Sequence, residues 1–436
     1  MTGLLLSLVV ASTPITLDEV RKEARNNLQA LQAVLTWQQS YEQIAINRGI
    51  LFPQISVGAN ASRTWNSVTE ARTIIIQGQP VTAGGPANAA NNFLVSANLN
   101  QVLIDAGRWY ALKQAGLLEV ANKGLAEDQA QASEFEAIRR FYVLYTAQVQ
   151  LKVLEETAQK SKEFADRAQA LFEAGRGTKG DALAALVNYY TDLNNAIQQR
   201  LTVEQAQIDL ASWIGRNEDA DLVAVQPASF GQPPVRVPAM DRALETAKME
   251  RAILRAYTAQ IGAAQANVTV QQAFLFPRLN GLLAFQHSSN KPGTAFTDLS
   301  VNNTYFAQLS LNWNIFDGMS TFAASRQAEV QVASAKLTYA QSERDVTGQV
   351  RTALDGLTNQ TQALAVISDN RDTAAKNLDY YEERFKAGAS NTLDVRDAQV
   401  KLLAAELTLA QTRANVQVAE ANLERAMGTL GNGAKP

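Results

Sequence analysis

Aspartates follow a glycine at the same spacing in each half of the chain. Asp181 lies six residues after Gly175, and Asp394 lies six residues after Gly388, with Asp397 about one helical turn further on. A carboxylate near the start of a helix is stabilised by the helix dipole, so each aspartate can be a capping residue. In an assembly of several chains around an axis, the same carboxylates would instead form rings at a constriction and favour cations. The residues alone leave both interpretations open.

The composition argues against catalytic and metal-binding chemistry. The chain of 436 residues contains no cysteine and a single histidine, His287. These counts exclude disulfides, thiolate metal sites, a cysteine nucleophile and any site that needs several histidines. The formal net charge of −3 gives no basic surface for nucleic acid. We therefore predict no catalytic residue, no metal site and no cofactor, and we expect that the protein is not an enzyme.

The elements that carry these aspartates belong to a repeated pattern. Four motif pairs occur in the same order in both halves: LFP at 51–53 and 275–277, IDAG at 104–107 and FDG at 316–318, FEAG at 172–175 and FKAG at 385–388, and WIG at 213–215 and AMG at 426–428. The last two pairs are each 213 residues apart, which indicates a duplicated unit of about that length. A cluster of four prolines within 227–238 marks a linker between the halves.

Each half contains two stretches in which apolar and polar residues alternate. They lie at 53–104 in the first half and at 277–316 in the second, and their polar members are mostly Ser, Asn, Gln and Thr. Period two predicts strands with one apolar face, and their length suits strands that cross a bilayer. Four strands cannot close a barrel, and open edges are not tolerated in lipid. A membrane location therefore requires several chains to share one barrel, and three chains would supply twelve strands.

Long segments without proline follow each strand pair, at 107–174 and 319–387. As single helices they would each be about 100 Å long, which is too long for a globular core to enclose. Shorter helical segments precede the strands and follow the long helices. A heptad seam from Val395 to Ala426 predicts close packing between helices. These features predict an elongated bundle or tube of helices.

The predicted organisation comprises a signal-peptide remnant, two repeats, a linker and a tail. The first repeat contains a helix, a β-hairpin, a long helix and a shorter helix, and the second repeat has the same order. The ranges are 1–13 for the remnant, 14–215 for the first repeat (hairpin about 53–104, helices about 107–174 and 181–214), 216–238 for the linker, 239–428 for the second repeat (hairpin about 277–316, helices about 319–387 and 391–427) and 429–436 for the tail.

The order and spacing of these motifs resemble those of the TolC-like outer membrane efflux proteins, the outer membrane factors, over essentially the whole chain. The resemblance implies a mainly α protein with β-strands, a homotrimer whose twelve-stranded outer-membrane barrel continues into a long periplasmic α-helical barrel. It implies a passive, gated exit duct of a tripartite efflux or type I secretion system in a Gram-negative bacterium, for small molecules or polypeptides. The implied partners are a periplasmic adaptor (membrane fusion) protein, an inner-membrane RND, MFS or ABC transporter, and outer-membrane lipid.

The resemblance also assigns gate positions. With Gly388 matched to the family's turn glycine, Asp394 and Asp397 fall on its periplasmic aspartate rings, and Phe385 takes an aromatic gate position. Asp181 falls on the gate aspartate of the first turn.

One gate position departs from the family pattern. Where the family carries a gate arginine, two residues after the glycine, this chain has Ser390. Arg176 and Lys179, which follow the other turn glycine, Gly175, are the alternative gate partners. The competing class is a soluble, elongated coiled-coil scaffold protein with small β-sheets.

Overall fold

The computed structural model describes residues 13–85, 87–217, 221–228, 230–231, 237–294, 300–387, 389–390 and 392–431. The contacts within the chain divide it into two units. Unit 1 comprises Met1–Gln38, Val120–Thr258 and Leu337–Pro436, and unit 2 comprises Gln39–Glu119 and Ala259–Lys336. Each unit therefore combines residues from both halves of the sequence.

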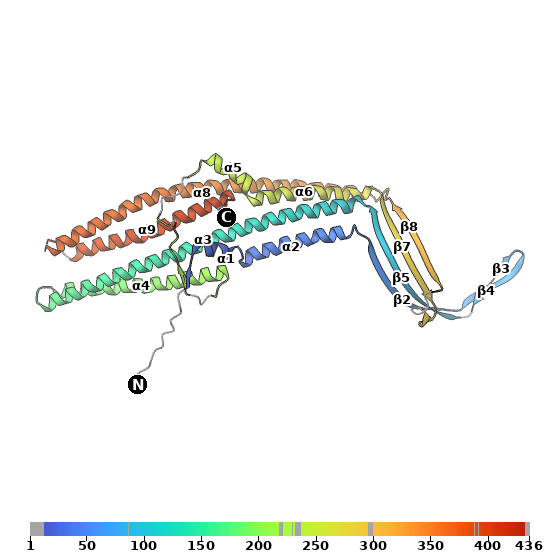
Figure 1. The fold of residues 1–436 in the computed structure, drawn as a ribbon, viewed down its shortest axis with the longest axis horizontal. Coiled ribbons are helices and arrows are strands. Elements are labelled where there is room, and N and C mark those ends of the chain that lie inside the picture. Colours follow the sequence, from blue (N-terminus) through green and yellow to red (C-terminus); the bar gives the residue numbers. More distant parts are fainter. Residues whose placement is uncertain are drawn as a thin grey trace, which may run out of the picture. The chain divides into compact units, whose positions relative to one another are not determined.

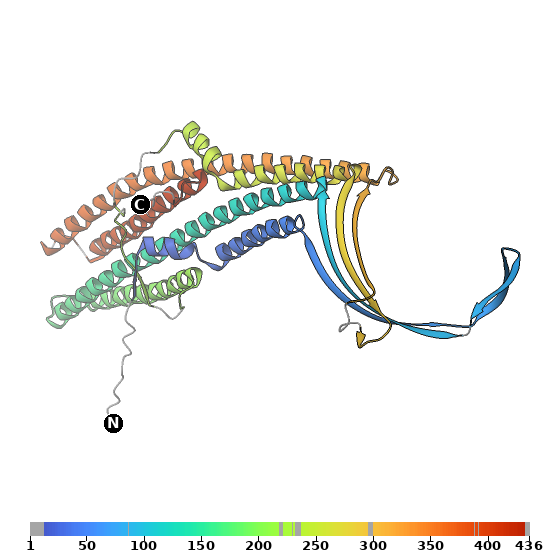
Figure 2. The same ribbon diagram turned by 45° about the vertical axis from the view of Figure 1, so that its right-hand side comes forward.

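Helices fill the two long windows without proline. The 68-residue helix α3 (Ala106–Glu173) and the 67-residue helix α8 (Ser320–Lys386) are each followed, after a short turn, by a 36-residue helix, α4 (Lys179–Ile214) or α9 (Thr392–Met427). Within unit 1, α3 lies beside α4 and α8 lies beside α9 (Figures 1 and 2). Without proline, nothing in these segments removes a backbone donor from the helical ladder. No helix in the described part of the chain combines the length and apolar character needed to cross a bilayer.

The helical segments before the strands are interrupted. The first consists of α1 (Leu17–Ala24) and α2 (Leu28–Gly49), and the second of α5 (Met240–Glu250) and α6 (Ala252–Gln272). The sequence analysis expected one helix at each place, and this was wrong. Neither interruption contains a proline or a glycine. The first is marked by Asn27, whose Oδ1 accepts the Ala30 N–H at 2.8 Å at the start of α2.

A buried arginine occupies the second interruption. Arg251 has φ −63° and ψ 112°, and only 3% of its surface is exposed. Its guanidinium donates to the Arg425 carbonyl at 2.7 Å and to Gln349 Oε1 at 3.1 Å, and it lies 3.5 Å from the Asp128 carboxylate. Burial lowers the pKa of Arg251. Because these partners come from α9, α8 and α3, tertiary contacts stabilise the extended residue between α5 and α6.

The core of unit 1 also holds the N-terminal elements. Strand β1 (Thr13–Ile15) pairs in parallel with β6 (Leu222–Ala224), two short strands that the sequence analysis did not predict. Helix α1 begins with a capping box between Thr16 and Glu19. Apolar side chains of α1, α3 and α4 are buried together next to these strands, among them Val20, Phe141, Leu144 and Leu210.

Unit 2 contains a four-stranded antiparallel sheet. Its order is β2 (Gln54–Asn66), β5 (Asn88–Ile104), β7 (Arg278–Ser289) and β8 (Asn303–Asn312). The central pair, β5 and β7, joins strands from the two halves of the sequence. In the described sheet, β2 and β8 each have one hydrogen-bonded neighbour, so both outer edges are unpaired.

The two faces of this sheet differ in polarity. The register places Leu99 opposite Ile55 on one side and Leu283 on the other, and Leu283 opposite Ala307. The alternate face consists mainly of Asn, Gln, Ser and Thr side chains. Among its paired positions, Arg278 at the start of β7 is the one ionisable residue. One face is therefore mainly apolar, with Arg63 and His287 among its ionisable residues, and the other is polar and almost uncharged.

The segment expected to be a loop between β2 and β5 contains a second hairpin. Strands β3 (Thr69–Ile76) and β4 (Gln79–Gly85) form a separate two-stranded sheet. The turn between them consists of Gln77 and Gly78, which have φ values of +56° and +79°. Positive φ at both turn residues suits the right-handed twist of a two-residue hairpin.

Candidate functional site at the helical turns

The first turn, residues 174–178, connects α3 to α4. Gly175 has φ +71°, a conformation that glycine adopts without strain. Thr178 is the N-cap of α4: its Oγ1 accepts the Asp181 N–H at 3.1 Å, and its hydroxyl donates to Asp181 Oδ2 at 2.6 Å. Asp181 therefore lies in the first turn of α4, where the capping Thr178 holds its exposed carboxylate. Arg176 and Lys179 are exposed, and neither forms an ion pair with the described residues.

The second turn connects α8 to α9, and Gly388 lies outside the described residues. Ser390 donates its hydroxyl to Asp394 Oδ2 at 2.9 Å, so it holds this carboxylate and supplies no cation. Asp397 pairs with Lys401 at 2.6 Å, four residues along the same helix, and both side chains are about 60% exposed. Arg384 donates to the Ala389 carbonyl at 3.0 Å and closes the turn from the end of α8.

Phe385 joins the two helical pairs. Its ring centroid lies 5.8 Å from that of Phe164 on α3, and the side chain is half-buried. The structure thus brings Phe385 of the second turn against the first helical pair.

A buried ion pair makes a stronger connection between the same helices. Arg396 of α9 donates from Nη1 to Asp192 Oδ2 at 2.7 Å and from Nη2 to Asp192 Oδ1 at 2.8 Å. The Ser161 hydroxyl of α3 donates to the same Asp192 Oδ2. Asp192 on α4 is 2% exposed. We call the ion pair of Asp192 and Arg396, together with its hydrogen-bond partner Ser161, the tip ion pair. None of them was among the residues selected from the sequence.

A signal for Asp192 exists in the sequence. The buried residues of α4 recur at heptad spacing: Ala182, Ala185, Asp192, Ala196, Val203, Ala206 and Leu210. Asp192 is the charged member of an otherwise apolar seam. A carboxylate at such a position must be paired, because an unpaired buried charge is strongly destabilising.

A cavity of about 230 Å³ lies beside the tip ion pair. Its lining includes Ser161 and Phe164 from α3, Asp181 and Asn188 from α4, and Arg396 from α9. The Asp181 carboxylate near the start of α4 and the Arg396 guanidinium near the start of α9 therefore border one space. Asp394 and Asp397 do not line this cavity.

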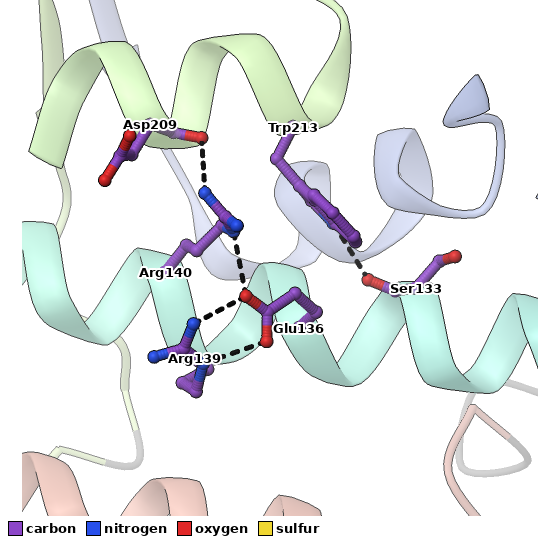
Figure 3. Close-up of polar contacts among 6 residues, drawn as sticks. All are labelled: Ser133, Glu136, Arg139, Arg140, Asp209 and Trp213. Atoms are coloured by element: carbon purple, nitrogen blue, oxygen red, sulfur yellow. Dashed lines mark hydrogen bonds and ion pairs between the residues drawn. The ribbon is translucent and has the colours of Figure 1, made fainter. Parts of the chain in front are cut away.

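A second polar cluster holds α3 against α4 further from the turn (Figure 3). Glu136 accepts two hydrogen bonds from Arg139, at 2.6 and 2.9 Å, and one from Arg140 at 3.0 Å. Arg140 also donates to the Asp209 carbonyl on α4 at 3.2 Å, and its guanidinium lies 4.7 Å from the Trp213 ring centroid. The hydrogen bonds from Arg139 are the main reason that the pKa of Glu136 is lowered. The first helical pair is thus fixed at a point remote from its turn.

The site therefore consists of charged and capping side chains at two helical turns. Within the described residues, no group of three or more His, Asp or Glu side chains is arranged to hold a metal ion. The carboxylates near the starts of α4 and α9 can shape an electric field and can bind cations weakly.

Comparison with known proteins shows which proteins this chain is similar to. The chain is 26% identical over 395 residues to the outer membrane efflux protein BepC of Brucella suis biovar 1, which covers 89% of this chain and 80% of BepC. It is 25% identical over 432 residues to the outer membrane protein TolC of Escherichia coli K12, covering 95% and 82% of the two chains. The Campylobacter jejuni CmeC outer membrane channel has the same fold, with a TM-score of 0.79 at 16% identity over 95% of this chain and 85% of CmeC.

A model of one protein family matches most of the chain, in one segment of each half. The matched residues are 20–216 and 243–429. The protein belongs to the outer membrane efflux protein family.

Proposed function

We propose that three copies of this chain form an exit duct of a tripartite efflux or type I secretion system, together with a periplasmic adaptor and an inner-membrane RND, MFS or ABC transporter. The family is one of passive outer-membrane channels with a periplasmic extension, not of enzymes. The observation that carries a barrel shared between copies is the sheet of unit 2, whose edge strands β2 and β8 have no outer neighbour among the described residues.

Closure of the sheet follows from the chemistry of the bilayer. Unpaired N–H and C=O groups on β2 and β8 would each cost several kcal/mol in hydrocarbon. If β8 of one protomer pairs with β2 of the next, three four-stranded sheets close into twelve strands without an edge. The apolar face then meets lipid, and the face of Asn, Gln, Ser and Thr lines the lumen. An almost uncharged lumen lets diverse solutes pass.

The helices provide independent support for assembly. Besides its buried seam, α4 has a second apolar stripe at heptad spacing that is exposed in the single chain: Leu183, Val187, Tyr190, Ile197, Leu201 and Ile208. A helix with two apolar stripes packs against partners on two sides. We propose that a neighbouring protomer covers this second stripe.

We further propose that the two turns form the periplasmic constriction. In the trimer, Asp394 and Asp397 would form rings of carboxylates, with Asp181 and Phe385 at the same end of each protomer. The carboxylates would make the entrance favour cations and bind cations that block it. The hydrogen bond from the Ser390 hydroxyl keeps the Asp394 carboxylate in place.

We also propose that the chain arose as two copies of one unit, 14–215 and 239–428, joined by the linker 216–238. The order of helices, strand pair, long helix and 36-residue helix supports this, because it occurs twice. The proposed substrates are small molecules or polypeptides.

The test uses the full chain expressed in a Gram-negative host. We expect a heat-stable trimer in the outer-membrane fraction and ion conduction after reconstitution into a planar lipid bilayer. A monomer in the soluble fraction would contradict the proposal and would favour the scaffold protein.

A further inference from the structure

We propose that the tip ion pair positions the carboxylates of the second turn and holds that turn against the first helical pair, the task for which an arginine is missing at position 390. The proposal names Asp192 and Arg396 as positioning residues. It rests on the proposed function, because it assumes that the two turns border a constriction.

The contacts show that the pair joins two separate helical hairpins. Arg396 lies in α9, about one helical turn after its first residue, Thr392. Asp192 belongs to α4 and Ser161 to α3. The guanidinium binds the carboxylate through two parallel hydrogen bonds, the geometry that fixes direction as well as distance. Ser161 binds one carboxylate oxygen and restricts the rotation of the Asp192 side chain. All three helices are therefore tied at one point.

Burial makes this connection different from the other ion pairs near the turns. Lys401–Asp397 and Arg200–Glu155 are each exposed by roughly half or more of both side chains. Such exposed pairs contribute little. Asp192 is 2% exposed, so removal of Arg396 leaves a carboxylate that has lost both charged hydrogen bonds and cannot reach water without movement of the helices.

Helical geometry links Arg396 to the predicted gate carboxylates. Successive residues of an α-helix are rotated by about 100°, so Asp394 points roughly opposite to Arg396, and Asp397 points roughly at a right angle to it. Because Arg396 is held against α4, α9 cannot turn about its axis, and Asp394 is directed away from the first hairpin. The ion pair thus determines which way the carboxylates of the second turn face.

The principal test measures single channels of Arg396→Leu in planar bilayers, with Mg²⁺ added to the periplasmic side as the blocking cation. We expect the conductance to rise and the half-blocking Mg²⁺ concentration to increase, by about tenfold or more if the turn is released. Arg396→Lys, which keeps the charge but not the paired hydrogen bonds, should restore the block only in part. Arg200→Leu, which breaks an exposed pair between α4 and α3, is the matched control and should leave both quantities unchanged.

A second variant tests the proposal if Arg396→Leu does not assemble. Asp192→Leu/Arg396→Leu buries no unpaired charge and should assemble, with the same raised conductance and weakened block. In addition, the effects of Asp192→Asn and Arg396→Gln should not add in the double variant, because each removes the same interaction. Unchanged conductance and block in assembled trimers of these variants would overturn the proposal. A wild-type protein that does not conduct at all would instead contradict the proposed function.

Discussion

Glu134 and Asp192 are carboxylates of unit 1 with exposures of only 1% and 2%, and each is bound by arginine from another helix. Arg21 of α1 and Arg25, which directly follows α1, both donate to Glu134 at 2.8 Å, and Arg396 of α9 donates to Asp192 at 2.7 Å. At the residue scale, buried acids therefore mark the points where helices distant in sequence are joined. Asp397 differs from them, because it is exposed and its partner Lys401 lies on the same helix.

The cation-favouring role of the second turn gives a first prediction. Asp394→Ala/Asp397→Ala should abolish block of the single-channel conductance by Mg²⁺ in a planar bilayer, because it removes both carboxylates that would form rings there. Asp241→Ala, which removes an exposed acid in the first turn of α5, is the control and should retain the block. Undiminished block in the double variant would contradict the role given to Asp394 and Asp397.

The lowered pKa of Glu136 gives a second prediction. A carboxyl whose pKa is lower in the folded than in the unfolded protein stabilises the fold above the unfolded value near 4.5, and this stabilisation is lost as the pH falls through the folded value. Glu136→Gln should therefore lose less thermal stability than the wild type between pH 7 and pH 4. The difference should stay below about 1 kcal/mol because Arg139 is half exposed. The thermal stability of both proteins is measured by circular dichroism in detergent. Equal losses in the variant and the wild type would contradict the prediction.

At the scale of elements, absence of proline and alternation of polarity were sufficient to predict the helices α3, α4, α8 and α9 and the four strands of the large sheet. The interruption at Arg251 was not predictable, because the extended residue is stabilised by Gln349 and Arg425, which are far away in sequence. Strands β3 and β4 were missed although residues 73–76 (TIII) favour a strand, because the Gly, Pro and Asn residues around them are typical of loops. Asp192 was recognisable as a charged residue in an apolar seam, but its partner Arg396 was not, since heptad spacing does not identify which helix lies opposite.

The exposed stripe of α4 yields a third prediction. Ile197→Glu should weaken trimer formation. Burial of an apolar side chain of this size contributes about 1.5–3 kcal/mol, and each copy of the variant would lose this contribution and place a charge in the interface. Gln198→Glu adds the same charge at the neighbouring exposed position outside the stripe and should assemble normally. Both variants are compared by heat stability of the trimer in gel electrophoresis. Equal stability of the two would argue that no neighbouring protomer covers the stripe.

At the scale of the whole molecule, the chain leaves two kinds of surface incomplete. The sheet of unit 2 has unpaired edges, and α4 in unit 1 has an exposed apolar stripe. Both are completed by further copies of the chain under the proposed assembly. The hairpin of β3 and β4 is different, because it forms a sheet of its own and shares no strand pairing with the large sheet.

Removal of that hairpin is the fourth prediction. Replacement of residues 69–85 by a short Gly/Ser link should preserve the trimer and its conduction, because β2 and β5 remain paired from Gln54 to Asn66 without it. The reconstituted variant is compared with the wild type for trimer yield and single-channel conductance. Loss of the trimer would mean that β3 and β4 take part in closing the barrel.

The pairing of Thr13–Ile15 with Leu222–Ala224 has a consequence for the order of folding. The two strands are more than 200 residues apart in sequence, so their contact carries the entropy cost of a very long closed loop. Helices such as α3 and α4 form from local contacts and can precede it. During export, the first strand must wait unpaired until the whole first repeat has crossed the inner membrane. We therefore expect the pairing of the first strand to be a late step in folding.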